Sequence, residues 1–518
     1  MSCPFHTPAP SYSSSTPVSL ARYPHESWLL GAASAVARNG LEFFERCEQT
    51  AGIVRTRFLV KQVYVVTDPT AIADVLVNHP KSFVKPYLLR RMKVLFGNGL
   101  LTSSGEQWAN HRHLVQPAFG ADCMTGFLRL VRQSTEEMLS SWCHRERCEE
   151  ERYDEERCDE EQRDSESRDG DVRDVYPEIV DLCMKNVAQT LFGVYDEELG
   201  SIVRALAATC HDLTHAVLNV GQLLPFRLPG RLKRRLDREL GALDNYIGRL
   251  VDRRMNDQRM NDQHRHEPPR RDFLGLLLSA GGEHGAPLSR QALLDESVTM
   301  LLAGHETTAS ALAWSLYLLA RHPKHADALA DDLVSHLQGD APSMSDLENL
   351  TSLRATLDET LRLYPPTHRI GRTVVSPVVV GGHKIPVGAD VLVPQWAVHR
   401  SARWYDRPLD FLPERWTPAF RRSLPKFAYF PFSGGPRLCV GTQLAYSEVA
   451  VILGMLAQRF QFSLCDEAPL VPYEGLTLLP AGGHLRLKIK RRSMSPAVPN
   501  HAVQNHAVPN HAAQLVYS

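Results

Sequence analysis

The stretch that decides the fold reads FSGGPRLCVG, residues 432–441, and it places Cys439 in a glycine-rich loop. The next residues, GTQLAYSEVAVILGMLAQRF, carry apolar side chains at helical spacing and predict a helix directly after the loop. Unpaired N–H groups and the positive end of the helix dipole stabilise a thiolate at such a position. We therefore interpret Cys439 as a metal-binding thiolate. A lone Cys-x-Gly would instead indicate a buried structural cysteine.

The other residues of the loop suit a flat, anionic partner. Gly435 and Gly441 have no side chains, so a flat macrocycle can approach the backbone closely. Arg437 can meet a carboxylate of that macrocycle. Phe432 can shield the sulfur of Cys439 and tune its electron donation.

With these residues the loop resembles the FxxGxRxCxG signature of the cytochrome P-450 superfamily and matches it at every fixed position. The resemblance covers about residues 20–490. It implies a mostly α fold with a small β subdomain. Heme b would lie between a long oxygen-activation helix and the helix that follows Cys439, and Cys439 would be the axial ligand of its iron.

Periodicity along the chain agrees with a mostly helical protein. Residues 53–67 alternate and are β-branched, which predicts a hairpin. Helical spacing dominates from about residue 68 to 365. Residues 370–400 are extended and broken by Gly and Pro, and the last strands are expected near 474–490.

A second motif, AGHETT, lies in the long helix predicted around residues 289–320. Gly304 weakens the helix locally, and the Thr307 hydroxyl can bond to a carbonyl one turn earlier. We expect the helix to open here beside Ala303. The resemblance implies that Thr307 binds the oxygen at the iron and that Glu306 relays protons. His305 is interpreted as a packing or solvent-facing residue.

A third motif pairs Glu359 with Arg362 on one helical face, because i and i+3 are neighbours there. The resemblance implies that the pair is buried and joined by Arg415 of a Pro-Glu-Arg segment. That network would stabilise the fold behind the ligand loop. Trp416 stands where Phe is commoner in the family, a difference expected to affect packing rather than chemistry.

Two further motifs indicate contacts with the cofactor's carboxylates. Trp108 and Arg112, at i and i+4, are both hydrogen-bond donors and point the same way. The family often has a propionate-binding His or Arg where this chain has His368 and Arg369, and we favour Arg369. The resemblance thus implies that the cofactor is bound by Trp108, Arg112, Ala303, Gly304, Arg369, Phe432, Arg437, Cys439 and Gly441.

Composition and charge exclude several classes of protein. Hydrophobic residues make up 43% and charged residues 23% of the chain, and the formal net charge is -1. This balance gives no reason to expect a nucleic acid or an anionic membrane as a partner. No basic segment with a following apolar run opens the chain, and the apolar stretch from Trp28 to Val36 is too short to span a bilayer. We expect a cytoplasmic monomer without a membrane anchor.

Three segments repeat with a period of five residues, at 146–160, 254–263 and 497–511. This period matches neither a helix nor a strand, so no single apolar face results. We interpret the segments as surface expansions without catalytic roles, and the first as a charge-laced extension of a helix.

The predicted domain organisation is simple. Residues 21–490 are expected to form one cytochrome P-450 domain with surface insertions at 144–174 and 254–270. Residues 1–20 and 491–518 are expected to be disordered.

The resemblance implies a heme monooxygenase that inserts one atom of O2 into a hydrophobic substrate, by hydroxylation or epoxidation. Electrons would come from NAD(P)H through a separate ferredoxin or flavodoxin and its reductase, docking at Arg421, Arg422 and Lys426. The alternatives are a heme-thiolate peroxygenase or isomerase and a non-catalytic heme sensor. The acid–Thr pair Glu306-Thr307 argues against them.

The substrate is left open between a terpenoid, a fatty acid and another secondary metabolite. Its pocket is expected from mostly apolar segments. These are the segment after Phe83, residues near 206–225, the Ala303 face, residues 366–370 and residues 476–479.

Overall fold

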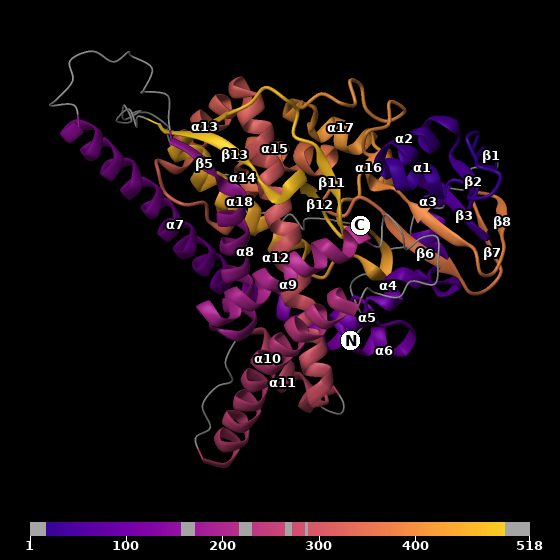
Figure 1. The fold of residues 1–518 in the computed structure, drawn as a ribbon, viewed down its shortest axis with the longest axis horizontal. Coiled ribbons are helices and arrows are strands. Elements are labelled where there is room, and N and C mark those ends of the chain that lie inside the picture. The colour runs from indigo at the N-terminus through magenta and orange to yellow at the C-terminus, as the bar shows by residue number, and fades with distance from the viewer. Residues whose placement is uncertain (1–16, 157–170, 217–229, 265–271, 285–287, 493–518) are drawn as a thin grey trace, which may run out of the picture.

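The computed structural model describes residues 17–156, 171–216, 230–264, 272–284 and 288–492. Long helices make up most of the molecule, and a twisted sheet lies at one end of it (Figure 1). The predicted fold class, mostly α with a small β subdomain, is confirmed.

The helices enclose the interior and carry most of the residues discussed below. In chain order they are α1 Ala33–Arg38, α2 Gly40–Thr50, α3 Pro69–Ala73, α4 Tyr87–Arg91, α5 Lys93–Phe96, α6 Gly105–Val115, α7 Ala121–Glu156, α8 Val175–Phe192, α9 Glu197–Ala216, α10 Gly230–His264, α11 Phe273–His284, α12 Arg290–Arg321, α13 Pro323–Leu337, α14 Met344–Asn349, α15 Thr351–Leu363, α16 Gln395–Val398, α17 Pro418–Ser423 and α18 Thr442–Arg459.

The strands form one larger sheet and three small ones. They are β1 Leu20–Arg22, β2 Ile53–Phe58, β3 Lys61–Val66, β4 Phe83–Val84, β5 Asp171–Asp174, β6 Ile370–Val374, β7 Val378–Val380, β8 His383–Ile385, β9 Asp390–Val393, β10 Phe460–Leu464, β11 Pro472–Glu474, β12 Leu478–Pro480 and β13 Arg486–Arg491. The larger sheet has the order β1-β2-β3-β9-β6-β4, and β5 joins the sheet β10-β13-β5.

The predicted hairpin is present as β2 and β3, paired antiparallel from Ile53 opposite Val66 to Phe58 opposite Lys61. The extended segment 370–400 is present as β6 to β9. Strand β5 was not predicted, because Asp171–Asp174 reads DVRD and lacks alternating apolar residues. It is a strand because it pairs with β13.

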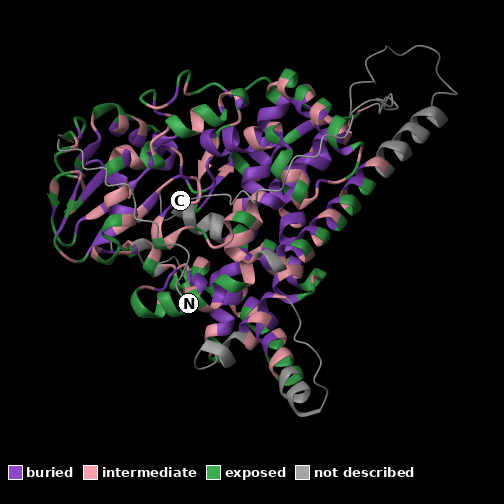
Figure 2. Cartoon of the chain, turned by 180° about the vertical axis from the view of Figure 1, so that it is seen from behind, coloured by how far each residue is buried: buried purple, intermediate pink, exposed green. Residues whose placement is uncertain are grey.

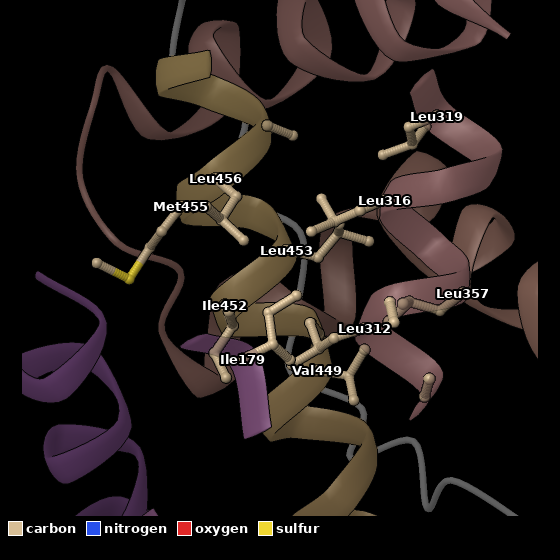
Figure 3. Packing of buried hydrophobic residues seen from close by; sticks show 14 of the residues in the cluster. Ile179, Leu312, Leu316, Leu319, Leu357, Val449, Ile452, Leu453, Met455 and Leu456 are labelled. Atoms are coloured by element: carbon tan, nitrogen blue, oxygen red, sulfur yellow. The ribbon is translucent and has the colours of Figure 1, made fainter. Parts of the chain in front are cut away.

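The main hydrophobic core lies between α12, α18, α8 and α15. In Figure 3, Leu312 and Leu316 of α12 lie close to Val449 and Leu453 of α18, and Leu357 of α15 lies beside them. These leucine and valine side chains are at most 5% exposed. Purple, buried segments accordingly run through the middle of the helical body in Figure 2. Among the residues that the structure describes, no helix combines the length and apolar character needed to cross a membrane.

Two of the period-five repeats continue long helices. Helix α7 runs on to Glu156 through most of the first repeat, and α10 runs on to His264 through the second. Both helices extend away from the body of the molecule (Figure 1). Residues 157–170 and 265–271 lie outside the described part, as do the predicted disordered ends apart from residues 17–20 and 491–492. The domain boundaries 21 and 490 stay predictions.

A buried carboxylate network joins α15 to the segment before the ligand loop. Arg362 donates from Nε to Oε2 of Glu359 and from Nη2 to Oε1, both at 2.8 Å, and both side chains are 0% exposed. Arg415 Nε and the Leu412 N–H also donate to Glu359, at 3.0 and 2.9 Å. A buried charge is costly unless it is paired and hydrogen-bonded, and these donors meet that requirement.

Trp416 also takes part in this network, so the expectation that it affects only packing is wrong. Its indole Nε1–H donates to Oε2 of Glu359 at 2.9 Å, and its side chain is 6% exposed. A phenylalanine in that place would fill similar space but donate nothing.

We predict that Trp416→Phe lowers the free energy of unfolding by about 1.5–3 kcal/mol, because it removes a hydrogen bond to a buried charge. Denaturant unfolding of the cofactor-loaded protein measures this change. Trp404→Phe is the matched control, because Trp404 Nε1 is buried and has no hydrogen-bond acceptor in the structure. An equal loss in both variants would show that the Trp416–Glu359 hydrogen bond contributes nothing.

Candidate cofactor site

The ligand loop is a tight turn that presents Cys439 just before α18. The Cys439 N–H donates to the Phe432 carbonyl at 3.1 Å, which closes the loop on itself. Gly435 has a φ of +67°, and a Cβ there would lie 2.0 Å from the Leu76 carbonyl oxygen. The neighbouring backbone alone therefore requires glycine at this position, and the approach of a macrocycle to Gly435 stays a prediction.

Gly441 differs from Gly435. A Cβ at Gly441 would meet only Phe119, at the ordinary contact distance of 3.6 Å. No described protein atom requires glycine at this position, so the close approach of a macrocycle to Gly441 stays a prediction.

The Cys439 side chain lies deep in the protein and is still accessible to solvent. Burial raises the pKa of its thiol, and the Gly441 N–H, the charge of Arg112 and the Thr442 hydroxyl act in the opposite direction. Its surface is nevertheless exposed. Burial and exposure agree if the Cys439 side chain lines a space inside the fold. Protein atoms then surround the side chain, while water can still reach it. An axial ligand needs that surrounding.

Helix α12 also combines burial with access. Nearly all of its residues from Leu293 to Ala320 are buried, but Leu302, Ala303, Gly304, Glu306 and Thr307 are partly accessible. Burial raises the pKa of the Glu306 carboxyl, and the Thr477 hydroxyl beside it acts in the opposite direction. Glu306, like Cys439, is therefore surrounded by protein and still reachable from a space.

The expected opening of α12 is absent from the structure, since the helix is uninterrupted from Arg290 to Arg321. The Thr307 hydroxyl does donate to the Ala303 carbonyl, at 3.0 Å, one turn earlier. A Cβ at Gly304 would lie 3.2 Å from Val187 of α8, so this glycine lets the two helices pack closely. His305 is a buried packing residue whose pKa burial lowers to about 4.

Near the ligand loop lies a cluster of cations that we call the cation cluster: Lys85, Arg372 and Arg437. Burial lowers the pKa of Lys85 to about 6, and Arg437 and Arg372 add to that effect. Burial, with the charge of Arg437, also lowers the pKa of Arg372 to about 10. Among the described residues, no member of the cluster forms an ion pair with a carboxylate. Lys85 is buried and Arg372 and Arg437 are partly buried. Like charges held together without counterions indicate that an anion belongs here.

Two predicted residues border the cation cluster. The Arg437 guanidinium lies over the Trp108 ring, 4.4 Å from its centroid. Arg112 donates from Nη1 to the Leu438 carbonyl at 2.8 Å, next to Cys439. The structure therefore brings Trp108, Arg112, Arg437 and Cys439 together.

Arg369 does not join them. Its guanidinium donates to Oε2 of Glu474 at 3.1 Å and lies near the Phe44 ring. Arg372, three residues further on, is the one that meets Arg437. Positions i and i+3 of an extended chain point to opposite faces, and Arg369 immediately precedes β6. The two arginines therefore lie in different surroundings. The sequence analysis did not identify Arg372 as a candidate site residue.

Sequence reasoning also missed a buried contact between α6 and α12. His111 Nδ1 lies 2.6 Å from Oε1 of Glu296, and both side chains are buried. Oε2 of Glu296 accepts the Leu100 N–H at 3.1 Å. This contact holds α6, the helix of Trp108 and Arg112, against α12. No short motif signals it, because 185 residues separate the partners.

The three basic residues that we expected to dock a redox partner differ in their surroundings. Arg421 forms an ion pair with the buried Asp358 and lies over the Trp416 ring at 4.9 Å. Its charge is therefore engaged inside the protein. Arg422 and Lys426 are exposed.

These residues fit a heme. Cys439 is exposed at the start of a helix although protein surrounds its side chain. Lys85, Arg372 and Arg437, which have no carboxylate partner among the described residues, match the two propionates of a heme. The accessible side chains of α12 fit a site for a small gaseous co-substrate and a proton donor.

Comparison with known proteins agrees with this chemistry. The family model described as Cytochrome P450 matches residues 22–487. Cyclooctatin synthase of Streptomyces melanosporofaciens is 29% identical, over 89% of this chain and 93% of that protein. Cyclooctat-9-en-7-ol 5-monooxygenase of the same organism is 29% identical, over 87% and 89%. 11-oxo-beta-amyrin 30-oxidase of Glycyrrhiza uralensis is 30% identical, over 81% and 77%.

A solved structure shares the fold. The crystal structure of the cytochrome P450DA heme domain aligns with a TM-score of 0.75 at 22% sequence identity. The alignment covers 93% of this chain and 99% of that one.

Proposed function

The chain belongs to the cytochrome P450 family and is a heme-dependent monooxygenase, and we propose that Cys439 is the axial thiolate ligand of its heme iron. When bound, heme supplies the oxidation: one atom of O2 enters a hydrophobic substrate and the other is reduced to water. The observation that carries the assignment is that Cys439 is solvent-exposed although protein surrounds its side chain. The Gly441 N–H, the Thr442 hydroxyl and Arg112 would stabilise its negative charge.

This assignment predicts a spectrum. The reduced, CO-bound protein should show the strongly red-shifted Soret band of a thiolate ligand, because a thiolate donates electron density to the iron. Cys439→Ala should abolish that band. A substitution at the exposed Cys465 should leave it unchanged. Retention of the band in Cys439→Ala would refute the assignment.

We propose further that the cation cluster holds the heme propionates, together with Trp108 and Arg112. Arg437 and Arg372 supply planar guanidinium groups, which suit carboxylates. A propionate beside Lys85 would raise its lowered pKa again and make it a third cation. In this proposal Arg372 replaces Arg369, because Arg369 is already paired with Glu474.

Arg372→Leu should speed heme loss by about tenfold or more, since one charge-assisted hydrogen bond contributes about 1.5–3 kcal/mol. The rate of heme transfer to an excess of a heme-scavenging protein measures the effect. Arg369→Leu is the matched control and should lose heme at close to the wild-type rate. Faster loss from Arg369→Leu than from Arg372→Leu would restore the prediction made from the sequence.

We propose that Glu306 and Thr307 deliver protons to the oxygen site. The supporting observation is that both side chains are accessible on one face of α12, while the adjacent His305 and Thr308 are buried. The raised pKa of Glu306 keeps its carboxyl protonated to a higher pH than an ordinary glutamate. A carboxyl poised in this way can donate a proton and recover it.

Thr307→Ala should lower the yield of product per O2 consumed and raise peroxide release, because the oxygen site loses its hydroxyl. Thr308→Ala is the matched control. Thr308 donates to the Gly304 carbonyl at 2.8 Å as Thr307 does to Ala303, but it is only 3% exposed. Peroxide and product measured together test both variants. Unchanged coupling in Thr307→Ala would refute the proton-delivery role.

The family implies a redox partner, and we propose a ferredoxin or flavodoxin that receives electrons from NAD(P)H through a reductase. Exposed Arg422 and Lys426, close in sequence to the ligand loop, support an acidic partner. Reconstitution with NADPH, reductase and ferredoxin tests this, and reduction by NADPH alone would contradict it. A cytoplasmic location and a monomeric state stay predictions from the sequence.

The substrate is hydrophobic, and we propose a terpenoid as its class. The support is that two of the similar proteins are named cyclooctatin synthase and cyclooctat-9-en-7-ol 5-monooxygenase. A screen of terpenoids and fatty acids for compounds that convert the heme from low to high spin tests the proposal. A shift produced by fatty acids alone would contradict it.

A further inference from the structure

Tyr429 and Phe430, which lie just before the ligand loop, are held by side chains from distant parts of the chain. The Tyr429 hydroxyl donates to Oδ1 of Asp358 in α15 at 2.9 Å. The Phe430 N–H donates to Nε2 of His399 at 3.0 Å. The Phe430 carbonyl accepts from Nε2 of Gln395 in α16 at 2.7 Å. Both polar groups of the Phe430 backbone are therefore bound by side chains instead of by secondary structure.

His399 is built to stay an acceptor. It is 0% exposed, and the rings of Tyr429 and Phe430 lie 5.3 and 5.1 Å from its own. Burial lowers the pKa of His399 to about 3; the nearby charges of Arg362 and Arg400 add to this, while the Leu361 carbonyl opposes it. The imidazole therefore stays neutral at physiological pH, and Nε2 keeps the lone pair that the Phe430 N–H needs.

The backbone of His399 connects this contact to the buried carboxylate network. Its carbonyl accepts from Nη1 of Arg362 at 2.9 Å. Beyond Phe430, the Ser433 N–H donates to the Phe430 carbonyl at 3.0 Å, and the Cys439 N–H donates to the Phe432 carbonyl at 3.1 Å. A continuous set of hydrogen bonds thus runs from Glu359 through Arg362, His399 and Phe430 into the ligand loop.

We propose that His399 is a positioning residue for the heme ligand: its imidazole fixes Phe430, and through Phe430 it fixes the loop that presents the Cys439 sulfur. The inference rests on the proposed role of Cys439. His399 touches neither the cysteine nor the space beside it, so it acts only through the loop backbone. Without the imidazole acceptor, the Phe430 N–H is left buried and unpaired, and the loop gains freedom to move the sulfur off the iron.

The test compares His399→Leu with His399→Gln in the heme-loaded protein. Leucine fills the buried space without an acceptor, whereas the glutamine amide oxygen can accept the Phe430 N–H. In the reduced, CO-bound protein, His399→Leu should raise the ratio of the non-thiolate band to the thiolate band by about tenfold, the factor that corresponds to one lost buried hydrogen bond. His399→Gln should return most of the thiolate band.

A second variant keeps the test informative if His399→Leu folds poorly. Gln395→Leu removes the side-chain partner of the Phe430 carbonyl, leaves the Ser433 N–H as its backbone partner, and should shift the band ratio in the same direction. The melting temperature of each variant, measured by circular dichroism, separates a loop effect from global unfolding. A loop effect should reduce the thiolate band at temperatures at which the variant is still folded.

The outcomes are distinguishable. A wild-type band ratio in folded His399→Leu would overturn the inference, as would a His399→Gln variant that behaves like His399→Leu. Absence of the thiolate band from the wild type would instead refute the proposed role of Cys439. Loss of the band in both His399→Leu and Gln395→Leu, with rescue by His399→Gln, would support the positioning role.

Discussion

The buried carboxylate of Glu359 is the constraint on which the architecture behind the heme depends. A fully buried charge must be neutralised and hydrogen-bonded, or the folded state loses several kcal/mol. The donors that satisfy it come from α15 itself and from the segment around residues 412–416. Arg362 also donates hydrogen bonds to the carbonyls of His399, Pro408 and Asp410. One carboxylate thereby organises a long stretch of irregular backbone that does not pair in a β-sheet.

That organisation matters because the ligand loop is irregular too. A loop with few internal hydrogen bonds can hold an axial ligand in place only if rigid neighbours determine its backbone. The hydrogen bonds to the backbone of Phe430 meet this requirement from the Glu359 side. On the other side, Arg112 of α6 binds the Leu438 carbonyl. Side chains therefore fix the loop at both ends: Gln395 donates to Phe430 and His399 accepts from it, and Arg112 donates to Leu438. The central turn is left to present Cys439.

The parts of this picture that the sequence predicts are those carried by residues close together in the chain. The Cys439 loop and the Glu359–Arg362 spacing are local patterns, and the structure has them in the expected elements. The errors arise where a long-range contact decides. Arg369 and Arg372 are equally plausible in sequence, and only the partner Glu474, 105 residues away, separates them. The donor role of Trp416 and the carbonyl of Leu76 beside Gly435 depend in the same way on tertiary contacts.

Helix α12 shows why residue type alone does not identify the proposed proton-delivery residues. Its backbone is regular, so function depends on which face a residue occupies. Ala303, Glu306 and Thr307 stand at i, i+3 and i+4 and share one accessible face. This face is bounded at both ends. One turn before Ala303, the Thr299 hydroxyl donates to the Phe96 carbonyl at 3.0 Å.

At the other end of the same face, two turns after Ala303, the Ser310 hydroxyl donates to the Leu478 carbonyl of β12 at 2.6 Å, and Ser310 is 0% exposed. The end of α5 and strand β12 thus contact α12 on either side of Ala303, Glu306 and Thr307. Between these two contacts, which are about three helical turns apart, the accessible residues of α12 are confined to 302–304, 306 and 307. Glu306 and Thr307 are the ones among them that carry a carboxyl or a hydroxyl. Thr308 has the same chemistry as Thr307 but lies one residue, or about 100°, around the helix and is buried.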